Sequence, residues 1–107
     1  MLTQEWIIKT LISLGLSPVE TQVYTFLIIH GPHRGNEIGE QVKLNMPQLS
    51  RTLAKLQNNG LITLSVDRPI VFSAMPLVRV LDDFIRKKKD QVELMEKSRK
   101  NLYSGWR

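Results

Sequence analysis

Hydrophobic residues recur at helical spacing through the first part of the chain, and this pattern predicts four consecutive helices. They are expected over residues 2–14, 18–30, 34–42 and 45–59. The apolar stripe of the first helix packs in the core or shares in a dimer interface, and it comprises Trp6, Ile7, Leu11 and Leu14. The inward residues of the second helix are Val19, Val23, Phe26 and Leu27, with Tyr24 and His30 near its edges. Four short helices in 59 residues indicate a mainly α domain.

Helix ends are marked by glycine and by capping residues. Ser17, Pro18 and Glu20 supply a capping serine, a proline at the first helical position and a glutamate at the third. Gly15 and Gly31 are expected to follow the ends of the first two helices. The third helix lacks a capping Ser or Thr, so we expect its first turn to be less well fixed.

Residues 35–60 have the pattern of a helix-turn-helix. Two amphipathic segments flank a break at residues 43–45, and Gly39 would allow the two helices to cross closely. Leu49, Leu53 and Leu56 form the inward stripe of the second segment. Its start has two interpretations. Either Asn45 caps it and Gln48 completes a capping box, or Met46 caps it with Pro47 at the first helical position.

After Gly60 the hydrophobic period changes from 3.6 to 2. Residues 61–66 and 70–74 alternate as two strands, and Asp67, Arg68 and Pro69 form the turn between them. A hairpin directly after such a helix is a wing, so the predicted fold class is a mainly α winged helix-turn-helix with a two-stranded wing. Arg68 at the tip either contacts the DNA backbone or minor groove, or is a solvated turn charge.

A long last helix is predicted from Leu77 to about Leu102, roughly 39 Å at 1.5 Å per residue. Lys88 and Arg99 interrupt its apolar stripe, which would weaken a tight coiled coil or fix its register. Residues 103–107 have no clear pattern and are expected to fray unless Trp106 finds a partner surface. The stripe is too apolar for water, so we predict a homodimer through Leu77, Leu81, Phe84, Ile85, Val92, Met95 and Leu102. Residues 1–76 then form the DNA-binding domain and residues 77–107 the C-terminal dimerisation helix.

Composition narrows the function classes. The 107 residues include no cysteine, and no apolar run approaches a membrane span, so a single-domain cytoplasmic protein is expected. His30 and His33 have no neighbouring ligand set, so we expect them to be solvated loop residues and expect no metal or other cofactor. No catalytic triad, paired catalytic carboxylates or phosphate-binding glycine loop can be assembled, and an enzyme is not expected.

The net charge of +5 is unevenly distributed: nine Lys or Arg and five Asp or Glu follow Pro76, against six and five before it. The run from Arg86 to Lys89 is either a solvated face or a second phosphate contact. The nearly neutral first 76 residues keep open a winged-helix interaction scaffold that binds no DNA.

Between Lys43 and Gly60 the chain has three basic residues and no acidic one. Positive charge combined with amide groups suits DNA phosphates and base edges. We expect Gln48 and Arg51 to read bases, and Lys43, Lys55 and Arg68 to contact phosphates. Asn45, at the start of this helix, is also a predicted DNA-binding residue.

The chain resembles the TrmB-like regulators, mainly archaeal winged-helix transcription factors, with MarR-like repressors as the nearest rival family. The matching stretches are LGLSPVE (14–20), HGP (30–32), EIGE (37–40), LAKLQNNGLI (53–62), RP (68–69) and FSAMP (72–76). The resemblance implies a dimer that binds duplex DNA, with the fourth helix in the major groove and the wing beside it. It implies helix contacts by Gln48, Ser50, Arg51 and Lys55, and a wing contact by Arg68. Larger members add a sugar-binding domain, for which this chain is too short, so a small-molecule effector is not expected.

Overall fold

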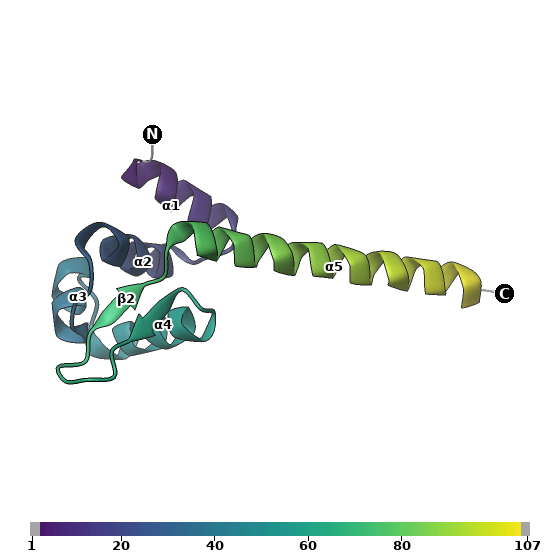
Figure 1. Cartoon of the computed structure of the whole chain (residues 1–107). Coiled ribbons are helices and arrows are strands. Elements are labelled where there is room, and N and C mark those ends of the chain that lie inside the picture. Colours follow the sequence, from purple (N-terminus) through teal and green to yellow (C-terminus); the bar gives the residue numbers. More distant parts are fainter. Residues whose placement is uncertain (1–2, 106–107) are drawn as a thin grey trace. The chain divides into compact units, whose positions relative to one another are not determined.

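A computed structural model describes residues 3–105 of the chain (Figure 1). Internal contacts divide the chain into two units, Met1–Leu77 and Val78–Arg107. The elements in order are α1 (Gln4–Ser13), α2 (Pro18–His30), α3 (Gly35–Val42), α4 (Met46–Asn58), β1 (Ile62–Leu64), β2 (Phe72–Ala74) and α5 (Leu77–Gly105). This order confirms the predicted winged helix-turn-helix.

The core of the first unit forms around α2, which packs against α1, α3, α4 and β2. The leucine stripe of α4 is buried as predicted, since Leu49, Leu53 and Leu56 all lie in the core. Val23 and Leu27 of α2 are also buried, whereas Val19 and Phe26 are only half-buried. Burial of the apolar stripes of these elements against α2 is the main source of stability for this unit.

The predicted core stripe of α1 is only partly correct. Ile7 and Leu11, one turn apart, are buried, but Trp6 is 44% exposed and Leu14 is half-buried. Trp6 lies about 100° around the helix from Ile7 and about 140° from Leu11, so it falls outside the buried stripe. Thr3 caps the helix through a 3.1 Å hydrogen bond from the Trp6 N–H. The predicted start at Leu2 lies outside the described residues.

Tyr24 is a core residue, and its prediction at the edge of α2 is wrong. The side chain is fully buried, and its hydroxyl donates a hydrogen bond of 2.6 Å to the carbonyl oxygen of Met75. Burial raises the pKa of Tyr24 to about 12. The tyrosine ring packs like an apolar side chain while its hydroxyl keeps a hydrogen-bond partner. Hydrophobic periodicity does not show that such a residue is buried.

Helix capping follows the sequence closely. In α2, the Glu20 N–H donates to Ser17 Oγ and the Ser17 N–H donates to Glu20 Oε1, both at 3.1 Å. In α3 no hydroxyl is present, but the Arg34 N–H donates to Glu37 Oε1 at 2.8 Å. Glu37 therefore supplies half of a capping box and fixes a first turn that we expected to be less well fixed.

The start of α4 follows one of its two predicted interpretations. The Gln48 N–H donates to Asn45 Oδ1 at 2.9 Å, so Asn45 is the cap and the alternative with Met46 as the cap is wrong. The preceding turn is fixed by Lys43, whose φ of 58° and ψ of 49° end α3 in the left-handed region. A Cβ atom at Gly39 would lie 3.2 Å from Leu49 Cδ2, which confirms that this glycine permits the close approach of α4.

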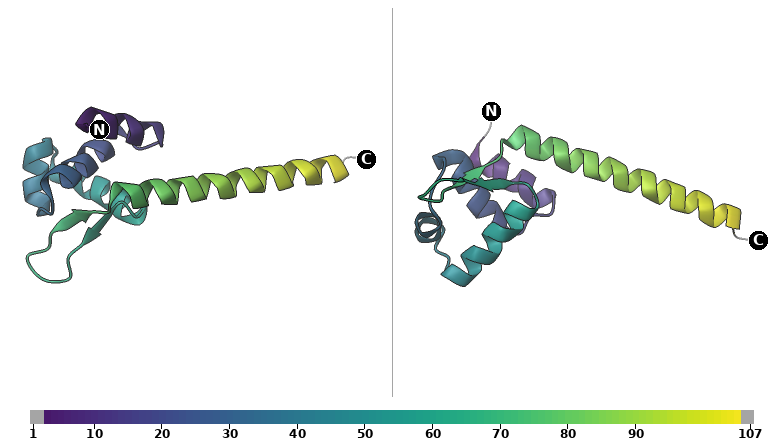
Figure 2. Two further views of the ribbon diagram at one scale, coloured as in Figure 1. Left: turned by 45° about the horizontal axis from the view of Figure 1, so that its top comes forward. Right: turned by 60° about the horizontal axis from the view of Figure 1, so that its bottom comes forward.

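The wing has shorter strands than predicted. β1 and β2 are antiparallel, with Ile62 opposite Ala74 and Leu64 opposite Phe72. The segment between them forms a long loop, closed by a 2.9 Å hydrogen bond from the Ser65 N–H to the Val71 carbonyl (Figure 2). A bridge between His33 and Phe72 gives β2 a second partner besides β1. One residue between two helices has no periodicity, so this bridge could not be predicted.

α5 is one continuous helix in both figures and is longer than predicted (Figures 1 and 2). Tyr103, Ser104 and Gly105 are helical, so the expectation that these residues fray is wrong, while Trp106 and Arg107 lie outside the described residues. Of the predicted dimerisation residues, Leu77, Leu81 and Phe84 are half-buried, whereas Ile85, Val92, Met95 and Leu102 are exposed. Within the described part of the chain, no helix is both long enough and apolar enough to cross a membrane.

Candidate nucleic-acid interface

The outward side of α4 carries most of the predicted DNA-binding residues. Leu49, Thr52, Leu53 and Leu56 fix the helix against the core, and Thr52 satisfies its hydroxyl by donating to the Gln48 carbonyl at 2.8 Å. The opposite side is exposed and presents Met46, Gln48, Ser50, Arg51, Ala54 and Lys55. This side has no acidic residue. It can therefore offer amide, hydroxyl and cationic groups to a bound molecule, because α4 has no acidic side chain that would pair with its own cations.

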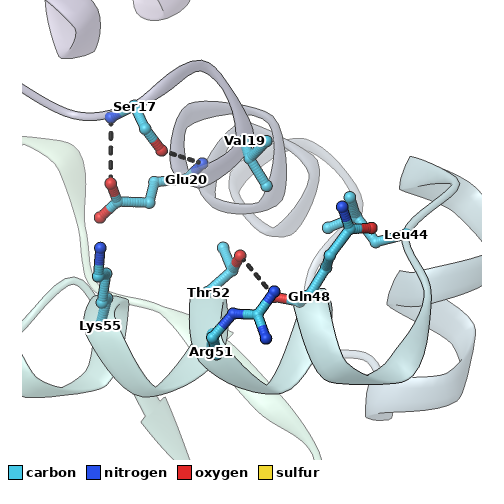
Figure 3. A pocket seen from close by; sticks show the side chains of 8 residues that line it. All are labelled: Ser17, Val19, Glu20, Leu44, Gln48, Arg51, Thr52 and Lys55. Atoms are coloured by element: carbon cyan, nitrogen blue, oxygen red, sulfur yellow. Dashed lines mark hydrogen bonds between the residues drawn. The ribbon is translucent and has the colours of Figure 1, made fainter.

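Three of these residues meet the start of α2 at a shallow pocket (Figure 3). Its lining comprises Ser17, Val19, Glu20, Leu44, Gln48, Arg51, Thr52 and Lys55. Arg51 and Lys55 lie one helical turn apart, and the structure therefore groups the predicted base-reading and phosphate-binding residues on one side. In the part of the chain that the structure describes, neither cation forms an ion pair within 4 Å.

Glu20 is an acidic neighbour that sequence reasoning did not associate with this surface. Its carboxylate accepts the Ser17 N–H, and the Lys55 side chain points toward it in Figure 3. The capping box therefore holds one negative charge at the edge of the basic side of α4. The net field of this surface is weaker than Arg51 and Lys55 alone would produce.

Gln48 and Asn45 are engaged with each other. Besides the bond from the Gln48 N–H, the Asn45 N–H donates to Gln48 Oε1 at 3.4 Å. The second bond is long and therefore weak. Gln48 can exchange it for a base contact, whereas Asn45 Oδ1 is held at 2.9 Å by the helix that it caps.

The structure does not bring Lys43 into the group around Arg51. Lys43 is exposed at the end of α3 and lines a different pocket, together with residues of α1 and α2 that include Gln22 and His30. Ser50 is exposed but does not line the pocket that holds Gln48, Arg51 and Lys55. The seven predicted contacts are therefore distributed over three places: the α4 side, the end of α3 and the wing.

Arg68 lies in the wing loop and is exposed. The loop also exposes two apolar residues that the sequence reasoning overlooked, Val66 at 98% and Ile70 at 44%. Proteins that bind the minor groove frequently insert apolar side chains between base steps. The alternation in residues 61–66 predicted a strand that included Val66 and placed its side chain on one face of a sheet. In the structure β1 ends at Leu64, so Val66 belongs to the loop.

The two histidines are structural in different ways. The backbone of His33 pairs with Phe72 through hydrogen bonds of 3.2 and 2.8 Å, so the prediction that His33 is a solvated loop residue is wrong. Its ring centroid lies 5.0 Å from that of Phe26, and the ring of the exposed His30 lies 4.8 Å from the same phenylalanine. Within residues 3–105, no three His, Asp or Glu side chains gather as a metal site would require.

A family model described as "sugar-specific transcriptional regulator TrmB" matches residues 11–77, which include α2, α3, α4 and the wing. The chain belongs to the TrmB family. This confirms the predicted TrmB-like regulator and, at the level of the family, a DNA-binding transcriptional regulator. No curated protein matches the chain in a sequence comparison.

Solved structures share the fold of this TrmB-family chain. The archaeal chromatin protein TrmBL2, whose structure is described as showing a novel mode of DNA binding, superposes with a TM-score of 0.87 at 16% identity. The match covers 98% of this chain but only 41% of TrmBL2, so the chain spans less than half of that relative.

Two bacterial regulators are also similar. Transcriptional regulator Tm0710 from Thermotoga maritima gives a TM-score of 0.61 at 19% identity, over 94% of this chain and 80% of its own. MepR, a regulator of a Staphylococcus aureus multidrug efflux pump, gives 0.58 at 15% identity, over 97% and 90%. At these identities the likeness shows the winged-helix fold alone.

Proposed function

We propose that this chain regulates transcription by binding duplex DNA as a homodimer. Residues 1–76 form the DNA-binding part and residues 77–107 the dimerising helix. The exposed side of α4 enters the major groove, and the wing loop lies along the backbone or the minor groove. The observation that best supports the proposal is that one exposed side of α4 presents Gln48, Arg51 and Lys55 together, and that α4 has no acidic residue.

The proposed contacts divide into positioning and reading. Lys43, Lys55 and Arg68 end in cations that suit phosphate oxygens and carry no sequence information. Arg51 can form paired hydrogen bonds with guanine, and Gln48 with adenine. Their places in the first two turns of α4 are those at which a recognition helix reaches base edges. Asn45 supports this arrangement by capping α4.

Support for the dimer comes from α5. Val92, Met95 and Leu102 are apolar residues between 47% and 66% exposed, and helical spacing places them on one side of the helix. Leaving such a stripe in water is unfavourable by about 25 cal/mol per Å² of apolar surface. Self-association would cover it and would double the number of phosphate contacts on each DNA.

Salt dependence of DNA affinity tests the proposal. Three phosphate contacts per protomer make six per dimer, so the logarithm of affinity should fall with the logarithm of salt concentration with a slope of about −5. A winged-helix scaffold that binds no DNA would show no measurable affinity at low salt for any duplex. That result would refute the proposal. The scaffold is the alternative to test because the first 76 residues carry little net charge.

A further inference from the structure

Charge along α5 is arranged in blocks of alternating sign. Asp82 and Asp83 are followed by a basic block, Arg86 to Lys89, and then by an acidic block. The acidic block comprises Asp90, Glu93 and Glu96, and the last block comprises Lys97, Arg99 and Lys100. All of these residues except Asp83 are exposed, and Asp83 is half-buried. Their order determines which alignment of two copies of α5 is electrostatically favourable.

The midpoint of α5, which runs from Leu77 to Gly105, is Gln91. If a second copy is reversed about this midpoint, blocks of opposite sign lie at the same level along the pair. The level pairs are Asp82 with Lys100, Asp83 with Arg99, Arg86 with Glu96 and Lys89 with Glu93. No two residues of like charge are level with each other. In a parallel pair in register, every charged residue is instead level with its own copy.

We propose that two copies of α5 associate as an antiparallel pair centred on Gln91. The inference rests on the self-association proposed above and specifies its partner, its direction and its register. Antiparallel reversal about Gln91 overlaps the helices over their full described length, as a parallel pair in register does. Charge, not apolar area, therefore distinguishes the two directions.

The faces of the helix support this direction. At about 100° per residue, Asp82, Lys89, Glu96 and Lys100 lie on one flank of the apolar stripe. In an antiparallel pair the same flank of each helix meets, whereas in a parallel pair opposite flanks meet. Asp82 then lies on the same side as Lys100 of the second copy and level with it. Lys89 lies on the same side as Glu96 of the second copy, within one helical turn along the axis.

The two cations within the stripe provide a second, independent observation. In a parallel pair, Lys88 and Arg99 would each meet their own copies at the closest approach of the helices, which is unfavourable. In the antiparallel pair neither cation is level with its own copy, since Lys88 is level with Leu94 of the second copy and Arg99 with its Asp83. The direct repulsion of like charges within the stripe is thereby avoided.

The flanking charges are available for these contacts. Within residues 3–105, the ion pair that α5 forms joins Arg86 Nη2 to Asp83 Oδ1 at 2.7 Å. Asp82, Lys89, Glu96 and Lys100 form none within 4 Å in the described structure. Arg86 and Asp83 both lie on the side of α5 away from the stripe, so their ion pair stays outside the proposed interface. Their level pairs with Glu96 and Arg99 add only weak, longer-range attraction.

Cysteine crosslinking tests the direction, because the natural chain has no cysteine. We expect Val92→Cys, close to the midpoint, to form a disulfide between copies on mild oxidation. Leu81→Cys and Leu102→Cys alone should not, since each cysteine would lie roughly 30 Å along the axis from its own copy. The double variant Leu81→Cys with Leu102→Cys should crosslink, because these positions lie almost level in the antiparallel pair.

The outcomes separate the direction from the function. Efficient crosslinking by Leu81→Cys alone would establish a parallel pair and overturn the inference, while leaving a dimer. A natural chain that sediments as a monomer at about 100 µM would overturn it as well, because a dimer with a Kd below that concentration would be populated. DNA affinity is measured separately on the natural chain, so failure to bind DNA refutes the proposed function without affecting the crosslinking result.

Charge reversal gives a second test with an internal control. Lys100→Asp should weaken self-association by roughly 3- to 30-fold, because two exposed ion pairs per dimer become repulsive. Adding Asp82→Lys should restore most of the affinity, since the pair is then re-formed with its charges exchanged. If the double variant associates no more tightly than the Lys100→Asp variant, the proposed register is wrong.

Discussion

The hydroxyl of Tyr24 in α2 donates a 2.6 Å hydrogen bond to the carbonyl oxygen of Met75, directly after β2. It joins residues 51 positions apart and connects the centre of the core to the strand that completes the wing. A helix that presents its exposed face to DNA must be held by contacts of this kind, because the α4 face itself contributes little to stability.

Replacing this tyrosine tests its role at neutral pH. Tyr24→Phe keeps the aromatic packing but leaves the Met75 carbonyl without its partner, so we expect the free energy of unfolding to fall by about 1–2 kcal/mol. Urea denaturation at pH 7 measures the change. Tyr103→Phe, at an exposed position in α5, is the matched control and should leave stability unchanged.

The same pair of variants predicts a pH dependence. Burial raises the pKa of Tyr24 from 10 to about 12, so between these values the unfolded chain loses the phenolic proton and the folded chain keeps it. The contribution of Tyr24 to stability is thus complete below pH 10 and is lost as pH rises toward 12. Tyr24→Phe should therefore lose less stability than Tyr103→Phe between about pH 9 and pH 11. Equal losses would show that the phenol is not protected by burial.

Arg51 and Lys55 should have different effects on DNA binding. Arg51→Ala should reduce discrimination between the preferred duplex and other duplexes by about 1–3 kcal/mol. Lys55→Ala should weaken binding to all duplexes alike and reduce the salt slope by about 2, because a dimer loses two phosphate contacts. Lys9→Ala removes one charge from α1, outside the proposed interface, and is the control. Unchanged affinity in both variants would remove α4 as the binding surface.

The wing loop offers a test that is independent of α4. Arg68 is exposed and forms no ion pair within 4 Å in the described structure, so Arg68→Ala should not change the melting temperature. If the wing contacts DNA, the affinity of the dimer should fall roughly 30-fold, because it loses two exposed charge contacts of about 1 kcal/mol each. Identical affinity would mean that the arginine is only a solvated turn charge.

The crossing of α3 and α4 depends on the absence of a side chain at Gly39. A Cβ atom there would lie 3.2 Å from Leu49 Cδ2 and 3.4 Å from the Leu44 carbonyl oxygen. Gly39→Val should therefore destabilise the fold by about 1–3 kcal/mol through overpacking and should reduce DNA affinity by displacing α4. Gly105→Val is the control, because a Cβ atom at Gly105 would have nothing within 4 Å of it. Calorimetry of both variants provides the comparison.

Association through α5 can be tested by placing one charge on either side of the helix. Val92→Asp introduces an acid into the apolar stripe and should shift the chain toward monomer in sedimentation experiments. Asn101→Asp introduces the same charge on the opposite side of α5 and should leave the association constant nearly unchanged. Equal effects of the two substitutions would indicate that the stripe is not the interface.

Much of the fold could be predicted because its signals are local. Ser17 and Asn45 mark helix starts through hydrogen bonds to residues three positions away, and the leucine stripe of α4 repeats within one helix. Tyr24 and the bridge between His33 and Phe72 could not be predicted, because each depends on a partner far along the chain. Trp6 was misplaced since a large apolar side chain at the edge of a stripe can lie on either side of it.

The candidate site was predictable in composition but not in arrangement. Gln48, Arg51 and Lys55 share one side of α4 because helical periodicity requires it. The sequence does not reveal that Glu20 lies at the edge of this side, or that Lys43 faces a different pocket. Both facts depend on how α2 packs against the helix-turn-helix.

The hydrogen bond between Gln48 Oε1 and the Asn45 N–H has a consequence for recognition. A glutamine that projects freely into water loses rotamer freedom when it contacts a base, and this loss opposes binding. Here the capping box already restricts the side chain before DNA arrives, so less conformational entropy remains to be lost. Selectivity at this position then depends on how readily a base replaces the 3.4 Å hydrogen bond between the Asn45 N–H and Gln48 Oε1.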